Sequence, residues 1–320
     1  MMNLAMSDKL LTIFTPTYNR EATLPRLYES LCRQTDGHFL WLVIDDGSTD
    51  GTKELVTEWE EQEVITIQYT YKENGGLHTG YNKAIELICT ELCMCVDSDD
   101  WLPEDAVEKV ISFWRHMGND KVAGIMGLDY NPDGSPIGGY FPSGLKYAKI
   151  IDLHYKYHHY GDVKFVHRTE LLKEVAPIPT FGEEKCFNPY YLFHQIDERY
   201  PLLVLNDKLC YVEYQEDGMS QNIIGQYLDS PRSFSELRKV VMKRKDAPWL
   251  IKFRNAIHYV SSQIMLRNKK WLEESPQKLM TVLAAPLGIL LYGYIKYKVG
   301  RNDYGLDKWL FNLVGKRTSS

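Results

Sequence analysis

Three aspartates lie within four residues in the segment Asp97-Ser98-Asp99-Asp100, directly after the apolar run Cys93–Val96. Side chains alternate along an extended chain, so Asp97 and Asp99 point to the same side if the strand continues. Two carboxylates on one side can bind a hard cation such as Mg²⁺ or Mn²⁺, and such a cation can stabilise a diphosphate as a leaving group. The alternative is an acidic loop that caps the helix expected after Pro103.

Two further polar segments can contact a nucleotide. In Thr15-Pro16-Thr17-Tyr18-Asn19-Arg20, the tyrosine can stack on a nucleobase and the arginine can reach a phosphate. In Asp45-Asp46-Gly47-Ser48-Thr49-Asp50, a carboxylate can accept a hydrogen bond from a base or a ribose. Each segment also has a structural explanation, namely a loop with one exposed aromatic side chain in the first and a turn followed by a helix N-cap in the second.

A glycine-rich segment, Asn74-Gly75-Gly76-Leu77-His78-Thr79-Gly80-Tyr81-Asn82, opens an expected helix. Its glycines permit a close approach of the backbone, and the N-terminus of a helix favours anions. The segment matches neither the Gly-x-Gly-x-x-Gly dinucleotide pattern nor a Walker-type loop. By itself it therefore identifies no ligand.

The elements that must position these segments follow from the hydrophobic pattern, which alternates apolar runs with helix-like spacing. This β-α-β-α order predicts an α/β fold with a mostly parallel sheet covered on both faces. Ligands bind such sheets outside the carboxyl ends of the strands, where the polar segments fall, so one shared site is expected. The expected strands are 10–14, 40–44, 64–71, 92–96 and 122–128, and the expected helices are 22–33, 53–59, 80–88 and 103–114.

The second half of the chain has a different character. Residues 131–231 are mixed, with strand-like runs at Leu202–Leu205 and Leu209–Tyr214, whereas residues 232–320 are helical in pattern. Residues 232–320 hold 18 basic and 6 acidic residues, a net charge of 18 − 6 = +12, against 19 − 37 = −18 for the remainder. This asymmetry predicts two regions with different partners.

The helical tail contains a stretch without formal charge, Leu279–Ile295, followed by Lys296, Lys298 and Arg301. Its 17 residues lie at the lower limit for a membrane-spanning helix, and Gly and Tyr residues dilute its apolar character. We interpret it as an interfacial helix suited to anionic lipid headgroups. The alternative is a helix packed on the catalytic domain.

Composition and cysteine usage set further bounds. The 320 residues suffice for one large α/β domain with a helical appendage, and 44% hydrophobic with 25% charged residues argues against disorder. None of the six cysteines forms a Cys-x-x-Cys pair, and the N-terminus does not have the pattern of a secretory signal, so a reducing cytoplasm is expected. The tyrosines around His154, His158 and His159 indicate a sugar-binding or packing segment rather than a metal site. Trp101 can stack on an acceptor sugar or pack in the core.

The order and spacing of the four polar segments together resemble glycosyltransferase family 2, a bacterial group that builds surface polysaccharides. The resemblance covers about residues 9–130 closely and 160–225 more loosely. It implies a GT-A (Rossmann-like) fold, with a mixed, mostly parallel sheet flanked by helices and a helical C-terminal region. Residues 1–231 would form the catalytic domain, with a nucleotide-sugar half (1–130) and an acceptor half (131–231), and residues 232–320 a basic, membrane-associated region.

The resemblance also assigns roles. Asp99 would be the principal ligand of a divalent cation, Mn²⁺ or Mg²⁺, with Asp97 beside it. Asp217 stands where the family often has the histidine of a Tyr-x-x-His-x-x-Ser element, and would add an oxygen ligand. The residues expected to contact the nucleotide-sugar are Thr15, Pro16, Tyr18, Arg20, Asp45, Asp46, Gly76, Asn82, Asp97 and Ser98.

An inverting transferase needs a base to remove the acceptor proton. In the family this base follows a glycine-rich or aromatic loop and precedes an amphipathic helix. The matching segment is Phe181-Gly182-Glu183-Glu184, before an expected helix at Tyr190–Ile196. Glu184 is the first candidate, Glu183 the second and Asp197 the third, although Asn188-Pro189 interrupts the usual acidic spacing.

The resulting hypothesis is a metal-dependent, inverting glycosyltransferase that moves a sugar from a UDP-sugar to a glycan or lipid-linked glycan acceptor. It would be cytoplasmic and peripheral at the inner face of the cell membrane. The alternatives are a nucleotidyltransferase and a non-catalytic glycan- or membrane-binding protein. Nucleic acid is not an expected partner, because the uncharged stretch within the basic tail fits a membrane better.

Overall fold

The computed structural model of the chain describes residues 9–214 and 222–301. These divide into two compact units, each with its own packing. The first unit comprises described residues 9–177 and 199–213, and the second comprises 178–198 and those from Tyr214 onward. The expected functional division at residue 231 stays a prediction, because the two units are defined by packing and not by activity.

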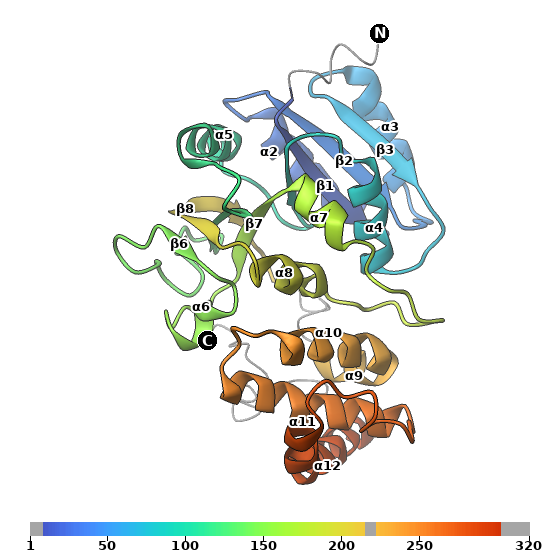
Figure 1. Ribbon diagram of the computed structural model, residues 1–320. Coiled ribbons are helices and arrows are strands. Elements are labelled where there is room, and N and C mark those ends of the chain that lie inside the picture. The colour runs from blue at the N-terminus through green and yellow to red at the C-terminus, as the bar shows by residue number, and fades with distance from the viewer. Residues whose placement is uncertain (1–8, 215–221, 302–320) are drawn as a thin grey trace. The chain divides into compact units, whose positions relative to one another are not determined.

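The first unit is built on an eight-stranded sheet with the strand order β3-β2-β1-β4-β7-β5-β8-β6 (Figure 1). Strands β3, β2, β1 and β4 run parallel to one another, and β5 and β8 form a second parallel pair. Strand β7 is antiparallel to both β4 and β5, and β6 is antiparallel to β8. The sheet is therefore mixed, as expected. The strands are β1 Leu11–Thr17, β2 Phe39–Asp45, β3 Ile67–Tyr71, β4 Leu92–Cys95, β5 Gly124–Tyr130, β6 Tyr147–Ala148, β7 Val163–Arg168 and β8 Leu202–Tyr211.

Helices cover both faces of this sheet (Figure 1). On one face, the apolar residues of α2, α3 and α5 form a core with alternate residues of β1 and β2, including Ile13 and Trp41. On the opposite face α4 lies against β1, where Tyr81 meets Phe14 edge to face at 5.1 Å. Burial on both faces explains why the central strands have apolar runs instead of alternation. The helices of this unit are α2 Leu24–Cys32, α3 Thr52–Gln62, α4 Leu77–Leu87, α5 Ala106–Met117, α6 Asp152–Tyr155 and α7 Thr169–Val175.

Strand β7 has no counterpart among the expected strands, although it lies between β4 and β5 in the sheet. Its sequence includes Lys164 and His167, which interrupt the apolar pattern but are 8% and 3% exposed. The two expected runs, Leu202–Leu205 and Leu209–Tyr214, fall largely within a single strand, β8, which ends at Tyr211 and whose register with β5 shifts around Leu128. Polar residues that become buried only in the assembled sheet therefore concealed one strand from the pattern.

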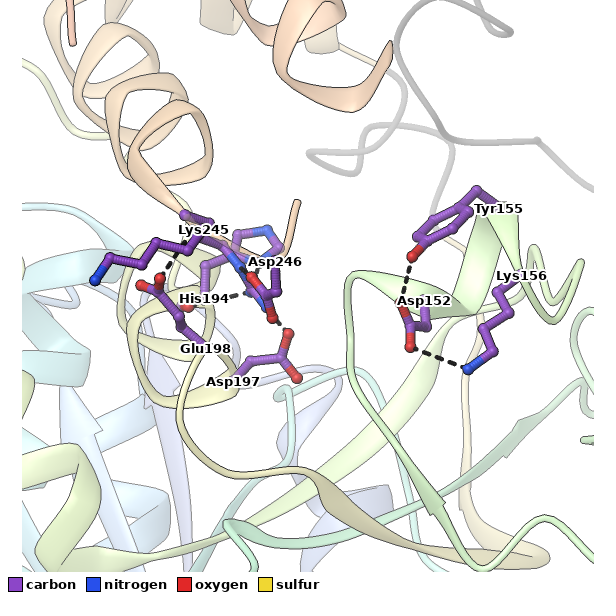
Figure 2. A network of polar contacts seen from close by, with 9 residues as sticks. Asp152, Tyr155, Lys156, His194, Asp197, Glu198, Lys245 and Asp246 are labelled. Carbon is purple, nitrogen blue, oxygen red and sulfur yellow. Dashed lines mark hydrogen bonds and ion pairs between the residues drawn. The ribbon is translucent and has the colours of Figure 1, made fainter. Parts of the chain in front are cut away.

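The second unit is helical, as expected. Helix α11 packs against both α10 and α12, around a core that includes Tyr227, Tyr259 and Ile295. A buried ion pair joins Arg244 to Asp197 at 2.7 Å, and the same guanidinium binds Asp246 at 2.9 Å (Figure 2). This network fixes the end of α8 to the residues that follow α10. The helices are α8 Tyr190–Asp197, α9 Ile223–Asp229, α10 Pro231–Lys243, α11 Trp249–Met265 and α12 Lys278–Gly300.

Candidate active site

The three segments expected to share a site do meet at one edge of the sheet. Strands β2, β1 and β4 are neighbours, so the residues after their carboxyl ends lie side by side. The amide of Asp46 donates to the carbonyl of Thr17 at 2.8 Å, and the amide of Val96 donates to the carbonyl of Phe14 at 3.1 Å. The parallel register thus brings the loops after residues 17, 45 and 96 together, as such sheets do at their ligand-binding edge.

The loops after β1 and β2 are joined by direct hydrogen bonds. The amide of Asn19 donates to Ser48 Oγ at 2.9 Å, and Asn19 Oδ1 accepts from the amide of Thr49 at 2.8 Å. The amide of Arg20 donates to Thr52 Oγ1 at 3.1 Å. Tyr18, between these contacts, remains 47% exposed and so is available to stack on a base.

Asp45 and Asp46 are buried and already engaged within the protein. Asp45 accepts from the Tyr69 hydroxyl at 2.5 Å and from the Ser48 amide at 2.7 Å. Burial, with the Asp45 carboxylate beside it, raises the pKa of Tyr69. Asp45 therefore has a structural role in the turn after β2, in addition to its expected nucleoside contact.

The Asp46 carboxylate organises the glycine-rich segment. It accepts from the amides of Gly75 and Gly76 at 2.9 and 2.8 Å, and it pairs with Lys72. Gly76 stands at the N-cap of α4 with a φ of 90°, a conformation that favours glycine. Asp46 thereby holds the start of α4 against the loop after β2.

Asp97 and Asp99 are close enough to influence each other. Burial and the neighbouring Asp97 raise the pKa of Asp99, whereas the cations Arg20 and Arg26 oppose that rise. A divalent cation suits this pair, because it would offset the repulsion between two carboxylates and prefers hard oxygen ligands. Residues 9–214 and 222–301 contain no cluster of three or more His, Cys, Asp or Glu side chains arranged for a metal. Asp217 lies outside the described residues.

Asp100, the third aspartate of the motif, points into a buried charge cluster. Its carboxylate lies 3.5 Å from the ammonium of Lys164 in β7, which also lies 3.9 Å from Asp129 in β5. Burial raises the pKa of Asp129 to about 7, against the opposing effect of Lys164. Neither Lys164 nor Asp129 was predicted from the sequence, although a lysine within the run Val163–Val166 is a usable signal.

Arg26 was also not predicted, yet it contacts the motif directly. From α2 it donates to the carbonyl of Asp99 at 2.5 Å and to the carboxylate of Glu213 at 2.5 Å. Its guanidinium lies over the ring of Trp101, 4.0 Å from the centroid, and Tyr211 stacks on the same indole at 5.2 Å. Packing therefore engages the indole of Trp101, and its expected alternative role in stacking on an acceptor sugar stays a prediction.

The remaining expected nucleotide contacts occupy varied positions. Thr15 is buried in β1 and accepts a hydrogen bond from the Trp41 indole at 3.0 Å, and Pro16 lies against Gly80 of α4. Ser98 is buried, whereas Asn82 is half-buried within α4. Thr15 and Pro16 therefore also help to pack the sheet beneath the site.

The candidate bases lie in the second unit. The Glu184 carboxylate accepts from the amides of Arg232 and Ser233 at 3.0 and 2.8 Å and from the Ser233 hydroxyl at 2.7 Å. These contacts cap the N-terminus of α10. Glu183 is exposed, and Asp197 is buried in its ion pair with Arg244.

Comparison with known proteins agrees with this fold. The sequence pattern of the family described as Glycosyl transferase family 2 matches residues 12–175. Glycosyltransferase GlyA of Streptococcus pneumoniae is 28% identical over 183 residues, which are 55% of this chain and 24% of that protein. The putative teichuronic acid biosynthesis glycosyltransferase TuaG of Bacillus subtilis is 32% identical over 105 residues, 32% of this chain and 41% of that one. The chain thus spans less than half the length of these curated relatives.

Solved structures share the fold at low sequence identity. S. aureus TarS 1-349 in complex with UDP has a TM-score of 0.58 at 16% identity, with 91% of each chain covered. Mannosyltransferase PcManGT from Pyrobaculum calidifontis, in complex with GDP-Man and Mn²⁺, has a TM-score of 0.54 at 15% identity, with 98% of this chain and 89% of that chain covered. These likenesses establish a common architecture for the sheet and its helices.

Proposed function

We propose a nucleotide-sugar site for this chain, which belongs to glycosyl transferase family 2 and is a glycosyltransferase. The site would lie in the first unit, at the carboxyl edge of β2, β1 and β4. The observation that supports this site is the meeting of Tyr18, Arg20 and the Asp97–Asp99 pair at neighbouring strand ends. Stacking, phosphate-binding and metal-binding groups are what a nucleoside diphosphate requires.

Within this site, we assign the nucleoside to Tyr18 and to the turn held by Asp45, and the diphosphate to Arg20. Asp97 and Asp99 would hold a divalent cation. When bound, Mn²⁺ or Mg²⁺ supplies electrostatic stabilisation to the departing diphosphate. UDP is the favoured nucleotide, supported by the structure of TarS that contains it.

We assign the proton transfer to Glu183. Inverting transfer needs one carboxylate to take the proton of the acceptor hydroxyl as the sugar is displaced. The carboxylate of Glu184 already accepts three hydrogen bonds at the start of α10, which favours a structural role. The exposed Glu183 has no such capping role among the contacts of the described residues.

The proposed acceptor is a glycan, attached to lipid, of a cell-surface polysaccharide. The named relatives support this proposal, because one is a putative teichuronic acid biosynthesis enzyme and both are bacterial proteins. We place the reaction in the cytoplasm, at the inner face of the membrane, where a nucleotide-sugar and a lipid-linked acceptor would meet. The helical second unit would provide the attachment.

Calorimetry of UDP binding, with and without Mn²⁺, tests the donor site. The wild type is expected to bind UDP only with Mn²⁺, and Asp99→Ala is expected to weaken that binding more than tenfold by removing the principal ligand. Asp133→Asn is the matched control, since this exposed aspartate lies in a turn with Ser135. Metal-independent binding, or equal binding by Asp99→Ala, would refute the assignment.

Turnover then separates the proposed reaction from its alternatives. A glycosyltransferase releases UDP from a UDP-sugar, whereas a nucleotidyltransferase releases pyrophosphate from a nucleoside triphosphate. A non-catalytic glycan-binding protein would bind without releasing either product. Screening UDP-sugars against lipid-linked acceptors, with detection of both products, distinguishes these outcomes.

A further inference from the structure

Helix α12 uses one face to pack within the second unit. Met280, Ala284, Gly288, Leu291 and Ile295 are buried and follow one another at intervals of three or four residues. Gly288 allows the close approach to α11, because a Cβ there would lie 2.6 Å from Cβ of Val260. Figure 1 shows α11 and α12 side by side. This face of α12 is therefore fixed to the protein.

A second face of α12, roughly 100° around the helix from the packed one, is apolar and exposed. Leu279, Leu283 and Leu290 are 76%, 58% and 68% exposed, and Leu287 continues the same stripe between them. The stripe runs from Leu279 to Leu290, about 17 Å along the helix, and so forms a continuous apolar surface. Surfaces of this kind mark sites of contact with a protein or a membrane.

The surrounding charge identifies the occupant. Lys278 and Lys296 are exposed near the two ends of the helix, and Arg301 follows it. Residues 232–320 carry a net charge of +12, so a second copy would bring two strongly basic regions together. An anionic lipid surface instead offers both the apolar interior and the opposite charge.

The packing of α12 also determines how it can meet a bilayer. Its length and composition are sufficient for a membrane-spanning helix. Spanning would carry α11 with it, because α12 is packed along α11 through Gly288. Helix α11 contains the buried polar residues Asn255, His258 and Gln263, and immersing that helix in hydrocarbon would be costly. Contact through the exposed stripe alone leaves α11 within the protein.

We infer that α12 lies flat in the headgroup region of an anionic membrane, with Leu279, Leu283, Leu287 and Leu290 inserted and the flanking lysines and Arg301 on the lipid phosphates. This inference extends the proposed placement at a membrane and does not depend on the transfer chemistry. It specifies a surface attachment and not a span, and it would bring the chain to the surface where a lipid-linked acceptor resides.

Flotation of the full chain with lipid vesicles tests this surface. Wild type is expected to float with vesicles of phosphatidylcholine and phosphatidylglycerol, and more weakly with phosphatidylcholine alone. The variant Leu283→Gln/Leu287→Gln/Leu290→Gln is expected to lose about a hundredfold in partitioning, since each leucine contributes apolar area to the interface. Val64→Gln is the matched control, because Val64 is 58% exposed in the first unit.

Four further measurements make the result decisive. Circular dichroism and Mn²⁺-dependent UDP binding, retained by the triple variant, show that it is folded and that membrane attachment is separate from the donor site. Wild type that fails to float, or a triple variant that floats equally well, would overturn the inference. So would a wild-type dimer that the triple variant converts to monomer, since the stripe would then bind a second copy. Resistance of bound protein to extraction by alkaline carbonate would show a spanning helix and overturn the flat arrangement.

Discussion

Replacing Arg26 by methionine should weaken donor binding although Arg26 is not expected to touch the donor. Its guanidinium donates to the main-chain carbonyl of Asp99 and to the carboxylate of Glu213, each at 2.5 Å. The same group lies 4.0 Å from the centre of the Trp101 ring. These contacts hold the backbone of the residue assigned as the principal metal ligand. Methionine retains much of the apolar stem but cannot donate, so the Asp99 carbonyl loses its partner.

The size of the expected loss in UDP-binding free energy follows from the kind and the exposure of each contact. A hydrogen bond from a charged donor contributes about 1.5–3 kcal/mol, and partial exposure of Arg26 favours the lower end of that range. The contact with Trp101, about 0.5–1 kcal/mol, and the half-exposed pair with Glu213, less than about 1 kcal/mol, stabilise the fold and do not act on the Asp99 carbonyl, so they do not enter the loss of binding. We expect a loss of about 1.5 kcal/mol in Mn²⁺-dependent UDP binding, which is roughly tenfold in Kd.

An electrostatic effect acts on the cation in the opposite direction. Removing the positive charge of Arg26 leaves Glu213 unbalanced, which would attract Mn²⁺ more strongly. The double variant Arg26→Met/Glu213→Gln removes both charges and so keeps the net charge of the wild type. We expect this double variant to remain about tenfold weaker, because the Asp99 carbonyl still has no donor.

Calorimetry of UDP binding in the presence of Mn²⁺ measures the change in donor affinity, and thermal unfolding measures any change in stability separately. Arg33→Met is the control, because Arg33 follows the same helix and, among residues 9–214 and 222–301, its side chain forms only long ion pairs with Glu29 and Glu104, at 3.8 and 3.9 Å. We expect the control to bind UDP as the wild type does. A double variant with wild-type affinity would refute the positioning argument and leave charge alone as the role of Arg26.

Two further predictions address the base and the dependence on pH. Glu183→Gln is expected to lower kcat about 10²–10⁴-fold, whereas Glu184→Gln should keep kcat within a few-fold and lose about 1 kcal/mol of stability at the start of α10. Assays of sugar transfer and urea unfolding measure these effects, and the converse pattern would assign the base to Glu184. Burial lowers the pKa of His167 to about 3, below the value of 6.5 in the unfolded chain. Between these two values the unfolded state binds a proton that the folded state does not, so stability falls as the pH falls from 6.5 towards 3. About 2 kcal/mol of the free energy of unfolding should be lost from this group by pH 5. Urea unfolding at pH 7 and pH 5 should show that His167→Gln lacks this loss. Equal losses in variant and wild type would contradict the assignment.

The sequence by itself determined the alternating architecture of the first unit and the edge at which its polar segments gather. Apolar periodicity is a local property, because residues a few positions apart share a face of a helix or strand. The runs at 10–14, 40–44 and 92–96 therefore located β1, β2 and β4 within a few residues. Since parallel strands present their carboxyl ends at one edge, the meeting of the segments after them followed from the same pattern.

The tertiary structure alone decided which residues hold those segments in place. Arg26 and Asp99 are 73 positions apart, and Lys164 reaches Asp100 from a strand whose polar residues disrupt the apolar pattern. Likewise Glu184 caps a helix that begins 47 residues later, at Pro231. Contacts between distant positions depend on how the elements pack, and a polar side chain buried by that packing has no local signature. The sequence could thus indicate the chemistry of the site, while its supporting contacts and the uncovered face of α12 became visible only in the folded chain.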